Sequence, residues 1–283
     1  MTWFFLSLFA LSMFIAYDVL SRKFGVQTKN PRVFAALYNA VCTVLSLFLF
    51  IGDRPTMPQF SAVLFVLLFL NLSVWAIFGR VEYVVHKHVE ASTLSILLQL
   101  APALSFLFSV FFLKEQITGA KIIGISLLLL VNIWIVTLVQ KGKTKLDFGI
   151  QYAIFLVLLL SIGWVLDKVV SPHLGVALFT FLSFFSPALF CGLFPKISMD
   201  DIRQELRQVP MKYIVTLASV NVLGYAAFIM ALTLGEASRV IPIAISVTPF
   251  VVLLSAWLLH ERSHMKEKWL ASCITLFAMF LLR

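Results

Sequence analysis

Charged residues are scarce in this chain. They make up 12% of its 283 residues, whereas 61% are hydrophobic. A soluble domain usually contains about 25% charged and roughly 45 to 50% apolar residues. A soluble core of this size could not bury so much apolar surface. The composition therefore excludes an ordinary soluble protein and indicates that lipid surrounds most of the chain.

Cysteine is scarce as well, and the three cysteines form no CxxC pair and no metal-ligand spacing. They are Cys42, Cys191 and Cys273, and all of them lie inside apolar segments. A cysteine in such a position is usually a small buried hydrophobic residue. We therefore expect no metal centre from these residues.

Motifs for chemistry in water are missing too. The sequence has no HExxH motif, no glycine-rich phosphate loop and no Ser, His and Asp cluster, and its five histidines lie at the ends of apolar segments. The 22 Lys and Arg residues are scattered singly or in pairs between apolar runs, unlike a nucleic-acid-binding patch. We expect no enzyme activity, no cofactor and no nucleic-acid partner.

What the chain does contain is a series of apolar stretches of about 20 residues, the length that crosses a bilayer as a helix. Such runs are too long, and alternate too little, for barrel strands. We predict a multi-pass all-α protein of a cell membrane, in the first place a bacterial inner or plasma membrane. The ten predicted spans are residues 2–20, 33–51, 61–83, 91–113, 120–139, 148–168, 174–194, 212–233, 240–259 and 268–282. The longest connector, 195–211, could hold a surface helix but no domain.

Two segments of the sequence repeat each other at an offset of 146 positions. Residues 90–115 and residues 236–261 both open with Glu-Ala-Ser and close with Glu. Each contains one proline, Pro102 in the first copy and Pro249 in the second. An internal repeat of this length predicts that the two halves have the same architecture.

The spans that precede these segments share an Asn-x3-aromatic-x2-Phe pattern. It is formed by Asn71, Trp75 and Phe78 in one half and by Asn221, Tyr225 and Phe228 in the other. Tyr17 and Trp164, 147 positions apart, are a third correspondence. Steps of three and four place each pattern along one stripe of a helix.

Five spans per half is an odd number, so the second half must cross the membrane in the opposite sense. Charge supports this, because sixteen of the 22 basic residues follow odd-numbered spans. We predict ten transmembrane helices in two inverted five-helix repeats, residues 1–141 and 147–283, around a central cavity. The positive-inside rule then places the odd connectors in the cytoplasm and both termini outside.

With these features the sequence resembles the ten-helix EamA-like branch of the drug/metabolite transporter superfamily. The resemblance is carried by Glu-Ala-Ser at 90–92 and 236–238, Pro102 and Pro249, Lys114-Glu115, His260-Glu261-Arg262, and Gly119 with Gly124. It implies two inverted repeats around a central cavity, with the fifth and tenth spans at the periphery. Members of this superfamily move amino acids, other metabolites and drugs, so the resemblance names no substrate.

The candidate substrate-binding residues are those of the two stripes and a few polar or aromatic neighbours. They are Asn71, Trp75, Gln99, Trp164, Asn221, Tyr225 and Tyr17. In this hypothesis the amides bind the substrate and the aromatic rings enclose it. The alternative is that the amides bond neighbouring helices and the rings pack in lipid.

Charged residues and prolines near the spans allow two readings each. Arg80 and Arg239 could bind an anion, or Arg80 could extend its charge to the membrane surface. Asp18 and Asp167 lie beside basic residues, which favours pairing at the interface over proton coupling. Pro102 and Pro249 are candidate helix breaks for gating, or simple kinks.

The sequence as a whole predicts a secondary transporter that exports small organic metabolites, such as amino acids or drug-like amphipathic compounds, by alternating access. Its partners would be the substrate and the lipid bilayer, and a homodimer is left open. Two alternatives remain. One is a carrier for phosphorylated or nucleotide-linked anions, and the other is a membrane scaffold that transports nothing.

Overall fold

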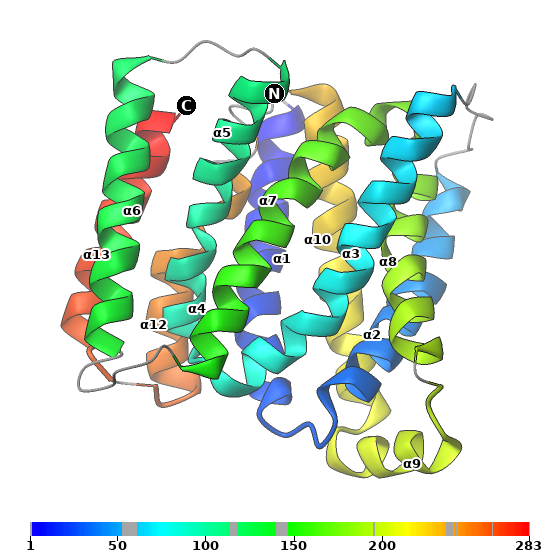
Figure 1. The fold of residues 1–283 in the computed structure, drawn as a ribbon. Helices are drawn as coiled ribbons and strands as arrows, with labels where there is room; N and C mark the ends of the chain where they lie inside the picture. Colours follow the sequence, from blue (N-terminus) through cyan, green and yellow to red (C-terminus); the bar gives the residue numbers. More distant parts are fainter. Residues whose placement is uncertain are drawn as a thin grey trace.

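The fold was analysed in a computed structural model. It describes residues 2–52, 61–113, 118–139, 147–194, 196–235, 240, 243–261 and 263–282. In these residues every regular element is helical. The helices form one bundle, and both termini lie at the same end of it (Figure 1).

The helices of the first half and of the second half follow one another along the chain. In the first half they are α1 (Thr2–Gly25), α2 (Pro31–Ser46), the 3-10 helix η1 (Leu47–Ile51), α3 (Ala62–His88), α4 (Ala91–Leu98), α5 (Leu100–Leu113) and α6 (Gly119–Val139). In the second half they are α7 (Phe148–Leu174), α8 (Val176–Leu193), α9 (Met199–Gln208), α10 (Met211–Leu234), α12 (Thr248–Leu258) and α13 (Met265–Leu282).

Six helices of the described residues are long and apolar enough to cross a bilayer, and they fall on six of the predicted spans. Three shorter apolar stretches, Ala91–Ser105, Ile122–Leu138 and Ile243–Leu258, fall on three more. The outer faces carry large apolar side chains such as Phe69 and Trp257, which are 64% and 70% exposed and which lipid can cover. The prediction of a multi-pass helical membrane protein is thus supported, while the count of ten crossings remains a prediction.

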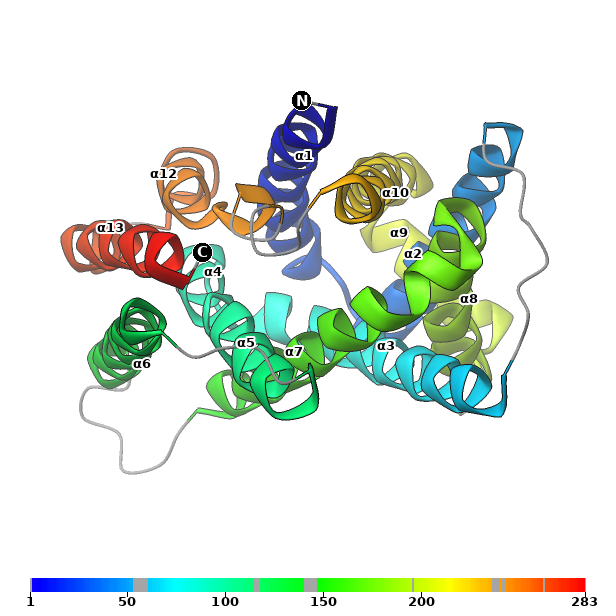
Figure 2. The same ribbon diagram turned by 90° about the horizontal axis from the view of Figure 1, so that it is seen from above.

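A contact between a helix of the first half and one of the second is matched by a contact between their predicted equivalents in the other half. Helix α1 packs along α10, and α7 packs along α3. Three further contacts join predicted equivalents directly, because α2 packs on α8, α4 on α12 and α6 on α13. Seen from above, α6 and α13 lie side by side at one edge of the bundle (Figure 2). The cavity described below is lined by residues of other helices, namely α1, α2, α3, α4, α7, α8 and α10.

The surface helix that the longest connector allows is present as α9, at the end of the bundle opposite the termini (Figure 1). Ser198 caps its start in a reciprocal capping box with Asp201. Glu205 is fully buried and accepts hydrogen bonds from the Thr28 hydroxyl and, at 2.8 Å, from the Asn30 backbone N–H. These bonds hold α9 against the connector between α1 and α2.

Helices α3 and α8 approach closely at Gly79. A Cβ atom at this position would lie 2.7 Å from Cβ of Pro187, closer than two such atoms can stand. Glycine is therefore required for this crossing. The close contact matters for the interior because Gly79 and Pro187 both line the cavity described below.

The cysteines follow the sequence expectation in two of three cases. Cys42 and Cys191 are buried. Cys273 is exposed, so the expectation of a buried residue is wrong there. The reason is that α13 lies at the edge of the bundle, where its outer face has no helix against it (Figure 2).

Candidate functional site

The interior of the bundle contains a cavity of about 160 Å³. A buried water occupies roughly 10 to 15 Å³ on this measure, so the space suits about ten waters or a small organic molecule. The residues that line the cavity come from α1, α2, α3 and α4 of the first half and from α7, α8, α10 and residues 245–247 of the second. The cavity thus lies between the two halves.

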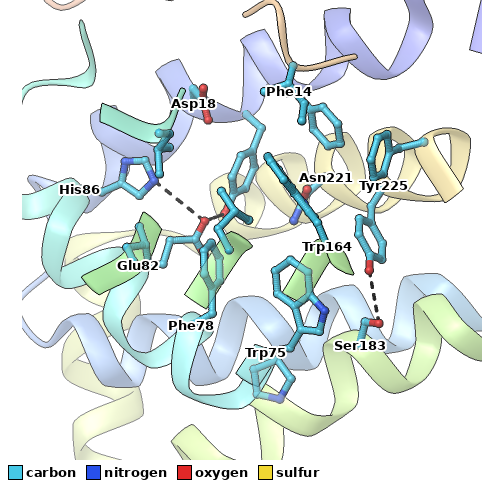
Figure 3. Close-up of a pocket in the computed structure, with 18 of the residues that line it drawn as sticks. Phe14, Asp18, Trp75, Phe78, Glu82, His86, Trp164, Ser183, Asn221 and Tyr225 are labelled. Atoms are coloured by element: carbon cyan, nitrogen blue, oxygen red, sulfur yellow. Dashed lines mark hydrogen bonds and ion pairs between the residues drawn. The ribbon is translucent and has the colours of Figure 1, made fainter. Parts of the chain in front are cut away.

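Aromatic side chains form much of the cavity wall (Figure 3). They are Phe14, Tyr17, Tyr38, Trp75, Phe78, Trp164, Phe184, Tyr225 and Phe228. The ring of Trp75 lies edge-on to Phe78 and to Tyr225, with centroid distances of 5.1 and 6.1 Å. Such a wall offers wide apolar faces, and the tyrosine and tryptophan rings add polar edges.

The stripes predicted on α3 and α10 meet in this cavity. Trp75 and Phe78 of α3, and Asn221, Tyr225 and Phe228 of α10, all line it. The side-chain amide of Asn221 donates a hydrogen bond to the hydroxyl of Tyr38. Tyr17 and Trp164, the third predicted correspondence, also line the cavity. These placements agree with the cavity hypothesis, although contact with a substrate remains a prediction.

Asn71 lies elsewhere, in a network around Asp167. Asp167 is fully buried in α7. Its Oδ1 accepts hydrogen bonds from the Asn71 amide at 2.7 Å and from the Trp75 indole at 2.9 Å, and its Oδ2 accepts one from the Tyr225 hydroxyl at 3.0 Å. The interfacial pairing favoured for Asp167 is therefore wrong, because this carboxylate joins three helices inside the bundle.

Asp18 and Glu82 stand at the other side of the cavity from Tyr225 and Ser183 (Figure 3). The Tyr17 hydroxyl donates a hydrogen bond of 2.5 Å to Glu82 Oε1. The same oxygen lies 4.0 Å from Nε2 of His86. Asp18 has neither a hydrogen bond nor an ion pair within the described residues. This side of the cavity is acidic.

Gln99 lies where the fourth predicted span is interrupted. Helix α4 ends at Leu98 and α5 begins at Leu100. The ninth predicted span is interrupted too, at residues 246–247. The Gln99 side-chain N–H groups donate to the carbonyl oxygen of Ile245 at 2.8 Å and to the hydroxyl of Thr248 at 2.7 Å. One interrupted helix is thereby bonded to the other.

Prolines follow both interruptions. Pro102 stands in the first turn of α5, and Pro249 is the second residue of α12. A proline has no backbone N–H and leaves the carbonyl four residues earlier without its helical donor. For Pro249 that carbonyl belongs to Ile245, which accepts hydrogen bonds from the Val247 backbone N–H at 2.7 Å and from the Gln99 amide at 2.8 Å instead.

Of the two arginines of the anion hypothesis, Arg80 belongs to the described residues, and it is bonded outside the cavity. Arg80 donates a hydrogen bond of 2.5 Å to the carbonyl of Phe194, and its guanidinium lies 5.5 Å from the ring centroid of Phe190. It does not belong to the cavity lining in the part of the chain that is described. Arg239 lies outside the described residues, as do residues 236–238 of the second Glu-Ala-Ser motif.

Ion pairs tie the helix ends together beside the acidic side of the cavity. Arg22 pairs with Glu261 at 2.8 Å and also donates to the carbonyl of His86 at 2.6 Å. Lys268 is fully buried and pairs with Glu90. Partial burial raises the pKa of Glu90, but hydrogen bonds from Lys268 and Ser263 outweigh this and lower the pKa below its usual value.

The sequence favours interfacial pairing for Asp18 and Asp167 and so does not place these two carboxylates in the interior. Glu82 continues the stripe of Trp75 and Phe78, and this spacing predicts its place in the cavity. Asp18 follows Tyr17 directly, so its position near the cavity could also have been inferred. Asp167 had no comparable signal, because its donors come from two other helices.

Comparisons with known proteins identify a family and a similar fold. The sequence profile described as "EamA-like transporter family" matches residues 1–137 and 147–283. A comparison with curated proteins finds no match. A solved structure titled "Crystal structure of protein" is similar over 96% of this chain and 95% of its own, with a TM-score of 0.62 and 13% sequence identity. At that identity the likeness shows the fold alone.

Proposed function

Because the chain belongs to the EamA-like transporter family, we propose that it is a secondary transporter that exports a small organic molecule, such as an amino acid or a drug-like amphipathic compound. The observation that carries this proposal is the cavity, whose wall comes from both halves of the chain. A carrier must expose one site to each side of the membrane in turn. A site between two halves can do so when the halves rock against each other.

The proposed architecture is a pair of inverted five-helix repeats, residues 1–141 and 147–283. The paired helix contacts support it, because α1 packs on α10 as α7 packs on α3. The position of both termini at one end of the bundle supports it as well (Figure 1). In this arrangement α6 and α13 pack against each other at the periphery of the bundle.

The interrupted helices are the proposed moving parts. Interruptions near the middle of a span commonly border substrate sites in carriers, because unwound backbone can bend and can bind ligands. Here Gln99 and Ile245, one from each interrupted helix, both line the cavity. Pro102 and Pro249 keep the two interruptions open by removing helical donors. We expect the Gln99 bond to Ile245 to break or shift as the halves move.

In the proposed binding mode, the substrate lies among aromatic rings and polar edges. Trp75, Tyr225, Trp164 and Tyr17 supply the rings, and Asn221 supplies an amide. Asn71 would act indirectly, because its amide donates a hydrogen bond to Asp167. The same carboxylate accepts hydrogen bonds from Trp75 and Tyr225, which line the cavity. Asn71 would thus be a positioning residue.

The proposed orientation places α9 and the basic connectors in the cytoplasm and both termini outside. This follows from the positive-inside rule, since most basic residues follow odd-numbered spans. The amphipathic α9 would then rest at the cytoplasmic membrane surface.

The test is a thermal-shift screen of the purified protein against a metabolite library, followed by transport in liposomes. A ligand that binds the folded state stabilises it by RT ln(1 + [L]/Kd). We expect at least one small organic compound to raise the melting temperature of the protein. The same compound should be transported across the membrane of liposomes that contain the protein. Compounds that bind but are never moved would support the scaffold alternative and contradict the proposal.

A further inference from the structure

We propose that the cavity selects positively charged substrates and binds their ammonium group at Asp18 and Glu82. The inference rests on the proposed function, because it names the substrate class of the same site. The site would bind amines in preference to neutral and anionic compounds of the same size.

The charge of the cavity wall is the first argument. Asp18 and Glu82 line the cavity, and no Lys or Arg does so in the described part of the chain. This is notable because the whole chain has a formal net charge of +9. Positive charge is abundant in the protein, but in the described residues no lysine or arginine contributes it to the cavity wall.

Two basic residues close in sequence to these carboxylates, Arg22 and Lys87, bond to other groups. Arg22, one helical turn after Asp18, pairs with Glu261 and donates to the carbonyl oxygens of His86 and Lys87. Lys87 itself donates to the carbonyl of Thr28 at 2.9 Å. On α3, His86 faces Glu82 at 4.0 Å, and the Tyr83 hydroxyl lies 3.3 Å from the hydroxyl of Tyr17.

The carboxylates have unused hydrogen-bonding capacity. Among the described residues Glu82 accepts one hydrogen bond, from Tyr17. Asp18 accepts none within the described residues. A carboxylate has about four acceptor positions, and leaving it unpaired in a medium of low dielectric is costly. A bound ammonium would supply both the charge and the donors that these groups lack.

Gln99 provides an independent acceptor in the same cavity. Its amide nitrogen must face the carbonyl of Ile245, because that group can only accept. The orientation of the amide is therefore fixed, and its Oε1 is left without a partner among the described residues. Gln99 is only 2% exposed, so this oxygen needs a donor from a ligand or water.

The aromatic wall suits the same ligand. A cation is attracted to the face of Trp, Tyr or Phe within about 6 Å of the ring centre. Trp75, Phe78 and Trp164 line the cavity together with Glu82. An anion would meet the rings and both carboxylates without a counter-charge and is disfavoured.

The test measures binding of three probes of similar size by thermal shift of the purified full chain. The probes are 2-phenylethylammonium, neutral 3-phenylpropanamide and anionic 3-phenylpropanoate. We expect the ammonium to bind at least about tenfold more tightly than the amide, and the anion to bind most weakly. Equal binding of the cation and the anion would overturn the inference, and this comparison needs only the wild-type protein.

Two conservative variants locate the charge preference. Asp18→Asn and Glu82→Gln should each weaken the ammonium by about tenfold or more and leave the amide unchanged. Asp200→Asn, on exposed α9, is the matched control and should change neither. Full ammonium affinity in both cavity variants would overturn the proposed site.

The outcome also separates this inference from the proposed function. If the amide or the anion binds and is transported while the ammonium is not, the protein is a carrier and only its charge preference is wrong. If none of the three probes binds, the inference fails, and the library screen decides the proposed function by itself.

Discussion

The side-chain amide of Gln99 donates a hydrogen bond of 2.8 Å to the carbonyl oxygen of Ile245. That carbonyl lacks its helical donor because Pro249 stands four residues later. The carbonyl of Ile245 in one interrupted helix therefore accepts a hydrogen bond from Gln99, which lies at the interruption between α4 and α5. Like the bond from Asn221 to Tyr38, this hydrogen bond links the two halves at the cavity.

Removing this amide should destabilise the protein and impair transport. Gln99→Leu removes the amide's hydrogen bonds to the Ile245 carbonyl and the Thr248 hydroxyl, while the carbonyl keeps one from the Val247 backbone N–H. Two such bonds together typically contribute about 1 to 3 kcal/mol. Unfolding in detergent and transport in liposomes would measure the two effects. The control is Asn132→Leu on peripheral α6, whose side-chain amide donates, among the described residues, to the carbonyl of Leu128 in its own helix. Equal loss of transport in both variants would contradict a special role for Gln99.

The Asp167 network predicts a graded series. Tyr225→Phe removes one of three donors and should lower the free energy of unfolding by about 1.5 to 3 kcal/mol, the usual value for a hydrogen bond to a charged group. Asp167→Ala leaves all three donors without their acceptor and should cost more. Denaturant unfolding in detergent measures both. A fully stable Asp167→Ala protein would show that the network is not structural.

The Glu90–Lys268 pair predicts a loss of stability in acid. The pKa of Glu90 is lowered in the folded protein from its model-compound value of 4.5, so the folded state holds this proton less tightly than the unfolded state does. The stabilisation is then present above about pH 4.5 and disappears as pH falls through the lowered value. As pH is lowered through this range, the melting temperature of Glu90→Gln should therefore fall less steeply than that of the wild type. The control is Glu267→Gln, which lies beside Lys268 at the start of α13, and its curve should follow that of the wild type. A Glu90→Gln curve parallel to the wild-type curve would refute the role of the Glu90–Lys268 pair.

The close contact at Gly79 predicts a steric effect. Gly79→Ala places a methyl group against Pro187 and should cost about 1 to 3 kcal/mol, as overpacking usually does. Gly192→Ala on α8 is the control, because a Cβ there meets nothing within 4 Å. The two melting temperatures should differ clearly. Similar values would mean that α3 and α8 can separate without strain.

The sequence predicts the helices and much of the cavity wall because both depend on local patterns. Apolar length locates the spans, and the stripe from Trp75 to Phe78 locates a cavity face. The role of Asp167 could not be predicted, since its three donors lie on two other helices and meet only after packing. Gln99 was ambiguous for a related reason, because its partner Ile245 matters only once Pro249 has freed a carbonyl.

The central claim is that water and substrate reach the cavity from each side of the membrane in turn. Phe78 lines the cavity, whereas Phe69 on the same helix is 64% exposed on the outer face. Each would be replaced by cysteine in a chain whose three native cysteines are alanine, and treated with a membrane-impermeant thiol reagent in vesicles of either orientation. A thiol in lipid does not ionise and stays unreactive. We predict that Phe78→Cys is labelled from both sides and Phe69→Cys from neither. A Phe78→Cys protein that no reagent reaches from either side would contradict the account.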